Sequence, residues 1–240
     1  SRNLCVFKTT LMNFIITGAS KGLGKEFSKF ASKFGGTIGI IASNQERLKH
    51  VAEDLKNCSV ITYTCDFTAS EAVQSLIHEL QADFKQIDVL INNVGAFEMG
   101  GLEETNIEQV NRMLAINFKA AFSITQGLLK VFKSQKSGAI INIGSIVTEQ
   151  PRKDISAYTI SKFALHGYTK VLTDELKDFG IKVTEIIPGS INTSSWDGIE
   201  APKEEFVQTK DLIDATEMIL KSSTGANFEQ IIVRPTNRNY

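Results

Sequence analysis

Two residues whose types and spacing suit acid–base chemistry stand in the stretch SAYTISKFALHGY, at residues 156–168. Tyr158 and Lys162 lie four positions apart, so a helix places them on one face. A free tyrosine has a pKa of about 10 and is a poor acid–base catalyst near neutrality. A nearby ammonium favours the phenolate and lowers that pKa, which would suit proton transfer to or from a substrate oxygen. An ordinary surface contact has the same spacing, so the pair alone does not decide.

A glycine-rich turn near the start of the chain could hold a phosphate group. The stretch TGASKGLG, at residues 17–24, lies between a short apolar run and an amphipathic segment. Glycines allow a tight turn and let the backbone approach a pyrophosphate, which then rests at a helix N-terminus. The spacing is GxxxGxG rather than GxGxxG, and a plain turn is the alternative reading. The candidate cofactor contacts in this turn are Gly18, Ser20, Lys21, Gly22, Leu23 and Gly24.

The residues after the second apolar run bear on which dinucleotide would bind. An NAD site usually has an acidic residue here to bind the ribose 2′-hydroxyl. Ser43 and its neighbours supply no acid, whereas Lys21 lies in the glycine turn and Arg47 follows shortly after. A missing acid and a nearby cation favour the 2′-phosphate of NADP, with Ser43 as a further contact, and make NAD the less favoured cofactor. Alternatively, both cations are solvated surface charges.

Apolar runs and amphipathic segments alternate along the chain, which is typical of strands and helices in an α/β domain. Such alternation implies right-handed crossovers and a parallel sheet covered on both faces, and continuous apolar runs suit strands buried on both sides. The expected strands are 12–17, 37–43, 59–67, 87–95, 138–145, 181–189 and 229–235. The expected helices are 24–35, 44–57, 70–84 with Ser70 as its N-cap, 106–133, 156–179 and 209–223.

These elements predict the fold class α/β, with one doubly wound Rossmann domain over residues 12–240. Its parallel sheet would have about seven strands, with helices on both faces. Residues 1–11, SRNLCVFKTTL, fit no element well and are expected to form a flexible N-terminal extension.

Composition sets limits on location and partners. The chain has 240 residues, of which 42% are hydrophobic and 22% charged, and its formal net charge is −1. This balance argues against nucleic acid as a main partner. No apolar run approaches the roughly 18 residues that span a bilayer, so no membrane partner is expected. Cys5, Cys58 and Cys65 have no metal-ligand spacing, which predicts no metal site and reduced thiols in a cytoplasmic protein.

With these motifs in place, the chain resembles the short-chain dehydrogenase/reductase family from Asn13 to Pro235. One of the motifs could arise by chance, but the whole series in register is specific. The motifs, in chain order, are TGASKGLG at 17–24, CDFT at 65–68, NNVG at 92–95, Asn117 in AINF, Ser145 in INIGS, YTISK at 158–162 and PGSINT at 188–193.

The resemblance implies four catalytic residues. Tyr158 would be the acid and base, and Ser145 would hold the substrate oxygen beside it. Lys162 would lower the pKa of Tyr158 and bond the nicotinamide ribose. Asn117 matches the family residue that holds a water in the proton relay to Lys162. Together they imply hydride transfer between the nicotinamide and a carbonyl or secondary alcohol.

The resemblance also implies cofactor contacts at the ends of later strands. Asp66 looks like the acid that meets the adenine amino group. Asn92 and Gly95 match the strand end along the adenosine half, although Val94 replaces the usual alanine. In the family, the loop that corresponds to PGSINT holds the nicotinamide carboxamide. Its candidate residues here are Pro188, Gly189, Ile191 and Thr193.

The function expected is therefore an NADP(H)-dependent oxidoreductase acting on a small-molecule carbonyl or alcohol. Resemblance to 3-oxoacyl-carrier-protein reductases is weakened by the ending EQIIVRPTNRNY, which replaces a glycine-rich tail. An alternative of another class is a dinucleotide-binding sensor or scaffold without turnover. Phe97, Met99 and Trp196 are candidate walls of the substrate pocket. The two longest expected helices predict a homodimer or homotetramer.

Overall fold

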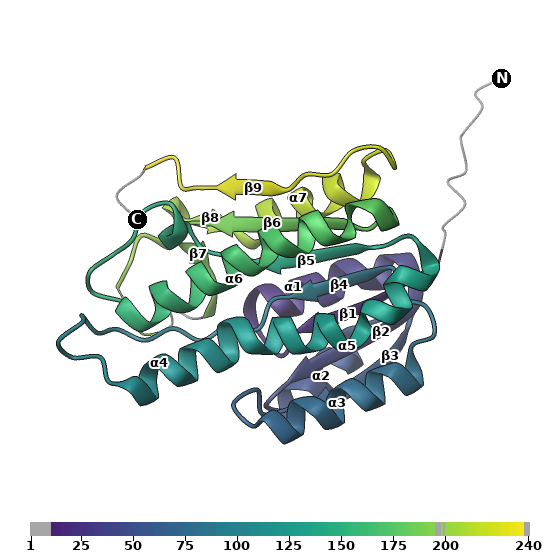
Figure 1. Cartoon of the computed structure of the whole chain (residues 1–240), viewed down its shortest axis with the longest axis horizontal. Coiled ribbons are helices and arrows are strands. Elements are labelled where there is room, and N and C mark those ends of the chain that lie inside the picture. The colour runs from purple at the N-terminus through teal and green to yellow at the C-terminus, as the bar shows by residue number, and fades with distance from the viewer. Residues whose placement is uncertain (1–10, 195–197, 199, 238–240) are drawn as a thin grey trace.

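The computed structural model describes residues 11–194, 198 and 200–237, and its centre is a parallel sheet (Figure 1). Over these residues the sheet is seven-stranded, with the order β3-β2-β1-β4-β5-β6-β9 and parallel pairing throughout. This confirms the predicted doubly wound α/β fold. Its strands are β1 (Met12–Thr17), β2 (Gly35–Ala42), β3 (Ser59–Thr64), β4 (Val89–Asn92), β5 (Ala139–Ile143), β6 (Lys182–Pro188) and β9 (Gln230–Val233).

Helices cover both faces of this sheet. One hydrophobic core packs α1, α2 and α7 against one face, and a second packs α3, α5 and α6 against the other. The reason is visible in β1, where Phe14 and Ile16 enter the first core and Ile15 enters the second. The α-helices are α1 (Gly22–Ala31), α2 (Gln45–Asp54), α3 (Ser70–Asp83), α4 (Ile107–Leu114), α5 (Ala120–Gln135), α6 (Ser156–Leu176) and α7 (Thr209–Lys221). The 3-10 turns are η1 (Ser32–Phe34), η3 (Ile146–Thr148), η4 (Lys177–Phe179) and η6 (Lys203–Glu205).

Three local features differ from the expectations. Ser70 does not cap α3: it is the first helical residue, and Ala69 precedes it without a side-chain cap. The expected helix over 106–133 is divided by a π-helical turn, η2 (Ala115–Lys119), between α4 and α5. A second parallel sheet joins β7 (Ile191–Asn192) to β8 (Val207–Gln208). Strands of two residues are too short to carry a periodic signal in the sequence.

The first strand, β1, begins at Met12, where the sequence predicts a strand. Of the predicted extension only Leu11 is described, and the rest lies outside the described residues. Within the described part of the chain, no helix combines the length and the apolar character that crossing a membrane requires.

The topology decides where the motifs meet. Because the strands are parallel, β1, β4, β5 and β6 all end at the same edge of the sheet. Ligands of doubly wound sheets bind in the crevice outside these carboxyl ends. The glycine turn, NNVG, INIGS and PGSINT each follow one of the four strands.

Candidate active site

The glycine turn is pressed against the end of β4. Gly18 has a φ of +68°, and a Cβ there would lie 2.8 Å from the Cα of Val94. A Cβ on Gly24 would lie 2.1 Å from the carbonyl oxygen of Gly18. The Thr17 hydroxyl accepts hydrogen bonds from the backbone N–H groups of Asn93 and Val94, both at 3.0 Å. The close contact therefore requires glycine at both positions and holds the turn at the strand edge.

The N-terminus of α1 is open to an anion. Lys21 is its N-cap residue, makes no side-chain cap, and no acid lies in the first turn. The first backbone N–H groups of a helix lack partners within the helix and favour a phosphate. Leu23 is buried and anchors the helix, while Ser20 is half-buried beside it. A Cβ on Gly22 would lie 3.5 Å from Thr193, so the turn and the PGSINT loop face each other.

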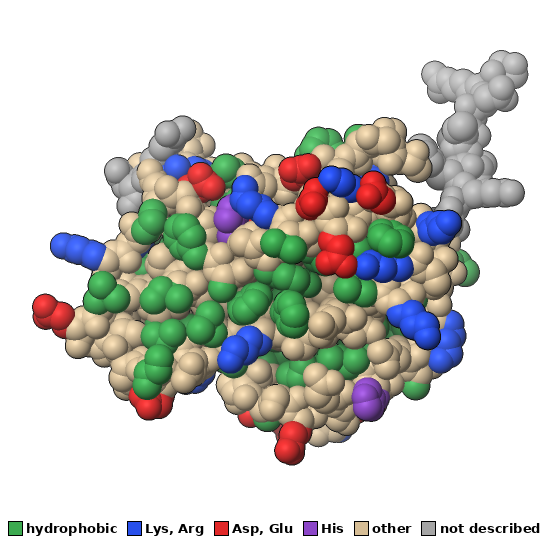
Figure 2. All heavy atoms as spheres, viewed as in Figure 1, with side chains coloured by type: hydrophobic (Ala, Val, Ile, Leu, Met, Phe, Trp, Pro, Cys, Tyr) green, Lys and Arg blue, Asp and Glu red, His purple; other side chains and the backbone are tan. Residues whose placement is uncertain are grey.

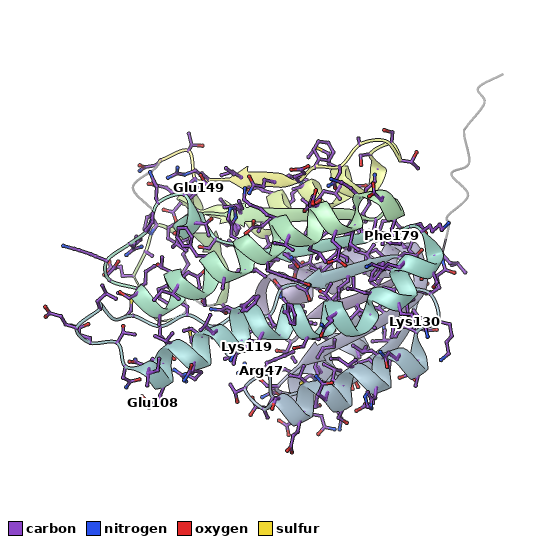
Figure 3. The ribbon with its side chains drawn as sticks, viewed as in Figure 1. Arg47, Glu108, Lys119, Lys130, Glu149 and Phe179 are labelled. Atoms are coloured by element: carbon purple, nitrogen blue, oxygen red, sulfur yellow. The ribbon has the colours of Figure 1, made fainter. Side chains whose placement is uncertain are left out.

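Exposed polar side chains follow β2 and β3, where the adenosine half of the cofactor is expected to bind. Asp66 accepts hydrogen bonds from the Thr68 N–H at 2.9 Å and the Thr68 hydroxyl at 2.7 Å. These bonds lower the pKa of the Asp66 carboxyl, which keeps it an acceptor. Ser43 is exposed just after β2, and Arg47 is exposed in the first turn of α2 (Figure 3). The side chains of Asp66, Ser43 and Arg47 are all exposed and accessible from this edge of the sheet.

The side chain of Asn92 points into the protein and is not available to contact a cofactor. Its amide is buried and donates hydrogen bonds to the Thr125 hydroxyl at 3.0 Å and to the Asn142 Oδ1 at 2.8 Å. Asn142 in turn donates to Thr169 at 2.8 Å. This network links β4, β5, α5 and α6 beneath the site, so only the backbone of Asn92 could meet a cofactor. Sequence reasoning does not find this network because its members are far apart in the chain.

The structure brings three of the predicted catalytic residues together. Tyr158 on α6 shares a side-chain hydrogen bond with Ser145, which follows β5. Burial raises the pKa of the Tyr158 phenol, and the bond to Ser145 opposes that rise. Lys162, also on α6, lies with its Nζ 5.8 Å from the Tyr158 ring centroid and donates to the Ile143 carbonyl at 2.8 Å. Burial lowers the pKa of Lys162 to about 8, and the carboxylate of Glu185 opposes that shift.

Asn117 sits in the π turn between α4 and α5, and its side chain is already occupied. Its Oδ1 accepts from the Ala96 N–H at 2.7 Å, and its Nδ2 donates to the Ala96 carbonyl at 3.0 Å and the Ser161 hydroxyl at 2.9 Å. Asn117 thus joins this helix to the loop after β4 and to α6. A Cβ on Gly95 would lie 3.4 Å from the Asn117 Oδ1 and 3.9 Å from the Lys162 Nζ.

The PGSINT loop is held from two sides. Pro188 is buried at the end of β6, and a Cβ on Gly189 would lie 2.7 Å from the Cδ of Pro235. Ile191 pairs with Val207 in the small sheet. These contacts direct the loop, including Thr193, toward the glycine turn. The predicted wall residue Trp196 lies outside the described residues.

The loop after β4 forms one wall beside the tyrosine. The Phe97 ring meets Tyr158 edge to face, with centroids 5.1 Å apart and an interplanar angle of 67°. This loop is tied to the start of α6, because the Gly100 N–H donates to the Asp154 carbonyl at 2.8 Å and Ser156 donates to Gly100 at 2.9 Å. Phe97 and Met99 remain largely exposed. An apolar substrate group could therefore contact this side of the site.

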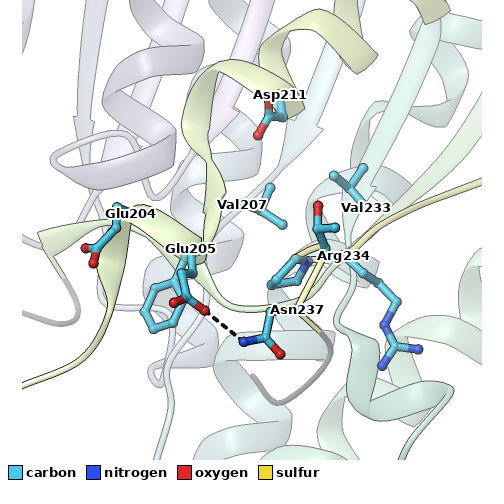
Figure 4. A pocket seen from close by; sticks show the side chains of 10 residues that line it. Glu204, Glu205, Val207, Asp211, Val233, Arg234 and Asn237 are labelled. Atoms are coloured by element: carbon cyan, nitrogen blue, oxygen red, sulfur yellow. Dashed lines mark hydrogen bonds between the residues drawn. The ribbon is translucent and has the colours of Figure 1, made fainter.

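A surface hollow elsewhere does not carry this chemistry. It lies beside the end of β9 and is lined by Glu204, Glu205, Asp211 and Arg234, with Asn237 donating to Glu205 at 2.9 Å (Figure 4). Its acidic lining supplies neither the tyrosine nor the glycine turn. The chemistry is therefore placed at the strand ends, not in this hollow.

A glycine turn at a helix N-terminus, beside a serine, a tyrosine and a lysine, is typical of a dinucleotide-dependent oxidoreductase. A sequence profile described as short chain dehydrogenase matches residues 13–204. The chain therefore belongs to the short-chain dehydrogenase family of NAD(P)-dependent oxidoreductases.

Individual relatives agree with this placement over nearly their full lengths. An oxidoreductase of Staphylococcus saprophyticus, named only as uncharacterized, is 30% identical over 224 residues, covering 92% of this chain and 96% of its own. A short-chain dehydrogenase from Sphingobium yanoikuyae in complex with NADPH has a TM-score of 0.82 and 26% identity, covering 92% of this chain and 87% of its own. L-Sorbose reductase from Gluconobacter frateurii, complexed with NADPH and L-sorbose, has a TM-score of 0.87 at 23% identity, covering 97% and 99%. This last likeness shows the shared fold alone.

Proposed function

We propose that this protein is an NADP(H)-dependent oxidoreductase that interconverts a small-molecule carbonyl and its secondary alcohol. The observation that carries the proposal is the meeting of Ser145, Tyr158 and Lys162 at the strand ends beside the glycine turn. The residues of that turn fit a dinucleotide, because Gly18 and Gly24 let the turn pack tightly against the end of β4 and the first turn of α1 carries no acid. When bound, the nicotinamide supplies or accepts the hydride.

The side chains of this protein then handle the proton. In reduction, Ser145 donates a hydrogen bond to the substrate oxygen, and the Tyr158 hydroxyl gives its proton to the alkoxide as charge develops. Lys162 stabilises the resulting phenolate from the same helix face. In oxidation the Tyr158 phenolate takes the proton of the alcohol. The hydrogen bond between Tyr158 and Ser145 supports these roles, because two hydroxyls this close together would both be within reach of one substrate oxygen.

The alternative of a non-catalytic sensor receives no support from this arrangement. A protein that only binds a dinucleotide needs the glycine turn but not a serine and tyrosine sharing a hydrogen bond. Oxidation of NADPH and NADH is tested against ketoses, 3-oxoacyl thioesters, diketones, aldehydes and semialdehydes. Turnover names the substrate class and decides whether a 3-oxoacyl thioester is used. Tight NADPH binding without turnover on the whole panel would favour the sensor.

Replacing Arg47 by glutamine is expected to raise the KM for NADPH about tenfold and to leave that for NADH within about twofold. The reason is that Arg47 is exposed in the first turn of α2, shortly after Ser43, and that none of residues 42–44 is the acid that would bind a ribose 2′-hydroxyl. Structural neighbours solved with NADP or NADPH support this preference. Initial rates with each cofactor measure it. Lys49→Gln, an exposed cation on the same helix, is the control, and equal effects of the two variants would contradict the assignment.

We further expect a homodimer or homotetramer in which α5 and α6 face a second copy. Figure 2 shows hydrophobic side chains gathered over these helices. The Phe122, Phe118 and Tyr168 rings contact one another, and Phe163 and Val171 are 43% and 65% exposed. Water contact of such side chains is unfavourable unless a partner covers them.

Sedimentation of Phe163→Glu tests this expectation. A charge in the covered face should shift the protein toward monomer. Met218→Glu places a charge at an exposed apolar site on α7, outside that face. A dimer through α5 and α6 should therefore survive this change, whereas a tetramer that also uses α7 should fall to a dimer. A wild-type protein that sediments as a monomer at micromolar concentration would contradict it.

A further inference from the structure

Glu185 is a buried acid that the proposed reaction does not use. It lies on β6 with 0% of its surface exposed. Its Oε2 is 2.7 Å from the Nδ1 of His166, and its Oε1 has no hydrogen-bond partner within the described residues. A Cβ on Gly144 would lie 2.3 Å from that Oε1, so glycine there leaves room for the carboxylate. Burying a carboxyl group with one oxygen unpaired is costly, which raises the question of what it does.

The carboxylate faces α6 and its cations. Lys162, His166 and Lys170 on that helix all act on it electrostatically. On the other side, β5 and Gly144, which follows it, contribute no charged side chain. A groove along α6 and β9 borders the same residue, and it also carries Asp174, Lys177 and Glu229. Burial raises the pKa of Glu185, while His166 and then Lys162 oppose that rise.

Lys162 is the cation that depends on this carboxylate. Only 5% of its surface is exposed, and its nearest hydrogen-bond partner is the neutral carbonyl of Ile143. Burial alone favours a neutral amine, since charge is poorly solvated there. Gly144 follows Ile143, whose carbonyl Lys162 bonds, and its ideal Cβ position lies 2.3 Å from the Glu185 Oε1. The carboxylate therefore lies near the buried ammonium, where its charge opposes loss of the proton.

We propose that Glu185, oriented by His166, is a positioning residue that keeps the ammonium of Lys162 charged beside Tyr158. This rests on the proposed function insofar as Tyr158 is the acid and base. His166 is partly exposed, with 17% of its side chain accessible, and its Nδ1–H holds the carboxylate in place on the buried side. Glu185 does not touch the reacting atoms and acts only through Lys162.

The direction of the effect follows from the order of proton loss. Lys162 can favour the phenolate of Tyr158 only while it is charged, and its pKa of about 8 limits that range. A nearby carboxylate raises the pKa of Lys162 and so extends to higher pH the range over which the ammonium stays charged. Without Glu185, Lys162 would lose its proton at lower pH, and Tyr158 would then ionise only at higher pH.

The decisive experiment titrates Lys162 itself by NMR in protein labelled at the lysine Nζ, with its signal assigned by its absence in Lys162→Met. Glu185→Gln keeps the shape of the side chain and removes its charge, so the pKa of Lys162 is expected to fall by about one unit. Glu229→Gln makes the same change at an exposed carboxylate in the same groove and should leave it unshifted. Equal titration of Lys162 in Glu185→Gln and wild type would overturn the proposal.

Two additions separate this proposal from the proposed function. Where turnover is found, alcohol oxidation needs the phenolate, so its rise with pH should move to higher pH in Glu185→Gln but not in Glu229→Gln. A shifted Lys162 with no turnover on any substrate would uphold the electrostatic role and reject the reaction. If Glu185→Gln does not fold, Glu185→Asp is measured in its place. Its side chain is one methylene shorter, so the carboxylate lies farther from Lys162. The pKa of Lys162 should then fall, but by less than the roughly one unit expected for the glutamine variant. An unshifted Lys162 in that variant would count against the proposal.

Discussion

Tyr158→Phe is expected to lower kcat for carbonyl reduction about a thousandfold and to leave NADPH binding within about threefold. The substitution removes only the hydroxyl that shares a hydrogen bond with Ser145, and the ring keeps its contact with Phe97. Hydride donation would continue to be geometrically possible, but the developing alkoxide would lack its proton donor. Steady-state kinetics and a fluorescence titration of NADPH measure the two quantities.

A matched tyrosine on the same helix serves as control. The Tyr168 hydroxyl interacts with Thr125, and burial raises the pKa of Tyr168 to about 12. Tyr168 is thus a largely buried, hydrogen-bonded tyrosine like Tyr158, but it has no role in the proposed reaction. Tyr168→Phe should retain kcat within about threefold. A Tyr158→Phe variant that keeps a tenth or more of the wild-type rate would remove Tyr158 from the mechanism.

The second large effect is expected from Gly24→Ala, which should weaken NADPH binding by about a hundredfold or more. The new Cβ would lie 2.1 Å from the Gly18 carbonyl oxygen and 2.7 Å from the Asn93 amide. Both neighbours belong to the contact between the glycine turn and β4, so the turn must move away from the strand edge. Overpacking of this kind also costs about 1–3 kcal/mol of stability. NADPH titration and thermal unfolding report the two effects.

Gly167→Ala is the control for the Gly24 substitution. Gly167 lies within α6, and a Cβ there would meet no atom within 4 Å. Alanine is the better helix former by about 1 kcal/mol, so this variant should be slightly more stable with NADPH binding unchanged. If Gly24→Ala binds NADPH as tightly as Gly167→Ala does, the glycine turn is not the pyrophosphate site.

The fold is predictable because its local signals agree with its topology. The central strands of the main sheet are short apolar runs, and alternate residues enter opposite cores, as Phe14 and Ile15 of β1 do. The π turn around Asn117 is not predictable, since its residues continue the helical pattern on either side. The cap expected at Ser70 is wrong because the chain is already helical there, just after the turn held by Asp66 and Thr68.

In the candidate site, contacts between residues close in the sequence are easier to predict than contacts between residues far apart in the chain. YTISK carries its own spacing, so the sequence alone pairs Tyr158 with Lys162. The sequence assigns Asn92 to a cofactor contact and gives no sign of its buried bonds to Thr125 and Asn142. Nothing near His166 in the chain indicates its acidic partner, because that partner lies on β6.

Residue patterns alone are enough to infer the doubly wound class, the family, the glycine turn and the helical pairing of Tyr158 with Lys162. Periodicity and short-range spacing act within one element, so they survive in the order of residues. The contact between Tyr158 and Ser145 and the burial of Glu185 on β6 beside His166 can be seen only in the folded chain. Such contacts join elements far apart in the chain, and packing of α6 against β5 and β6 creates the low-dielectric setting that gives them their strength.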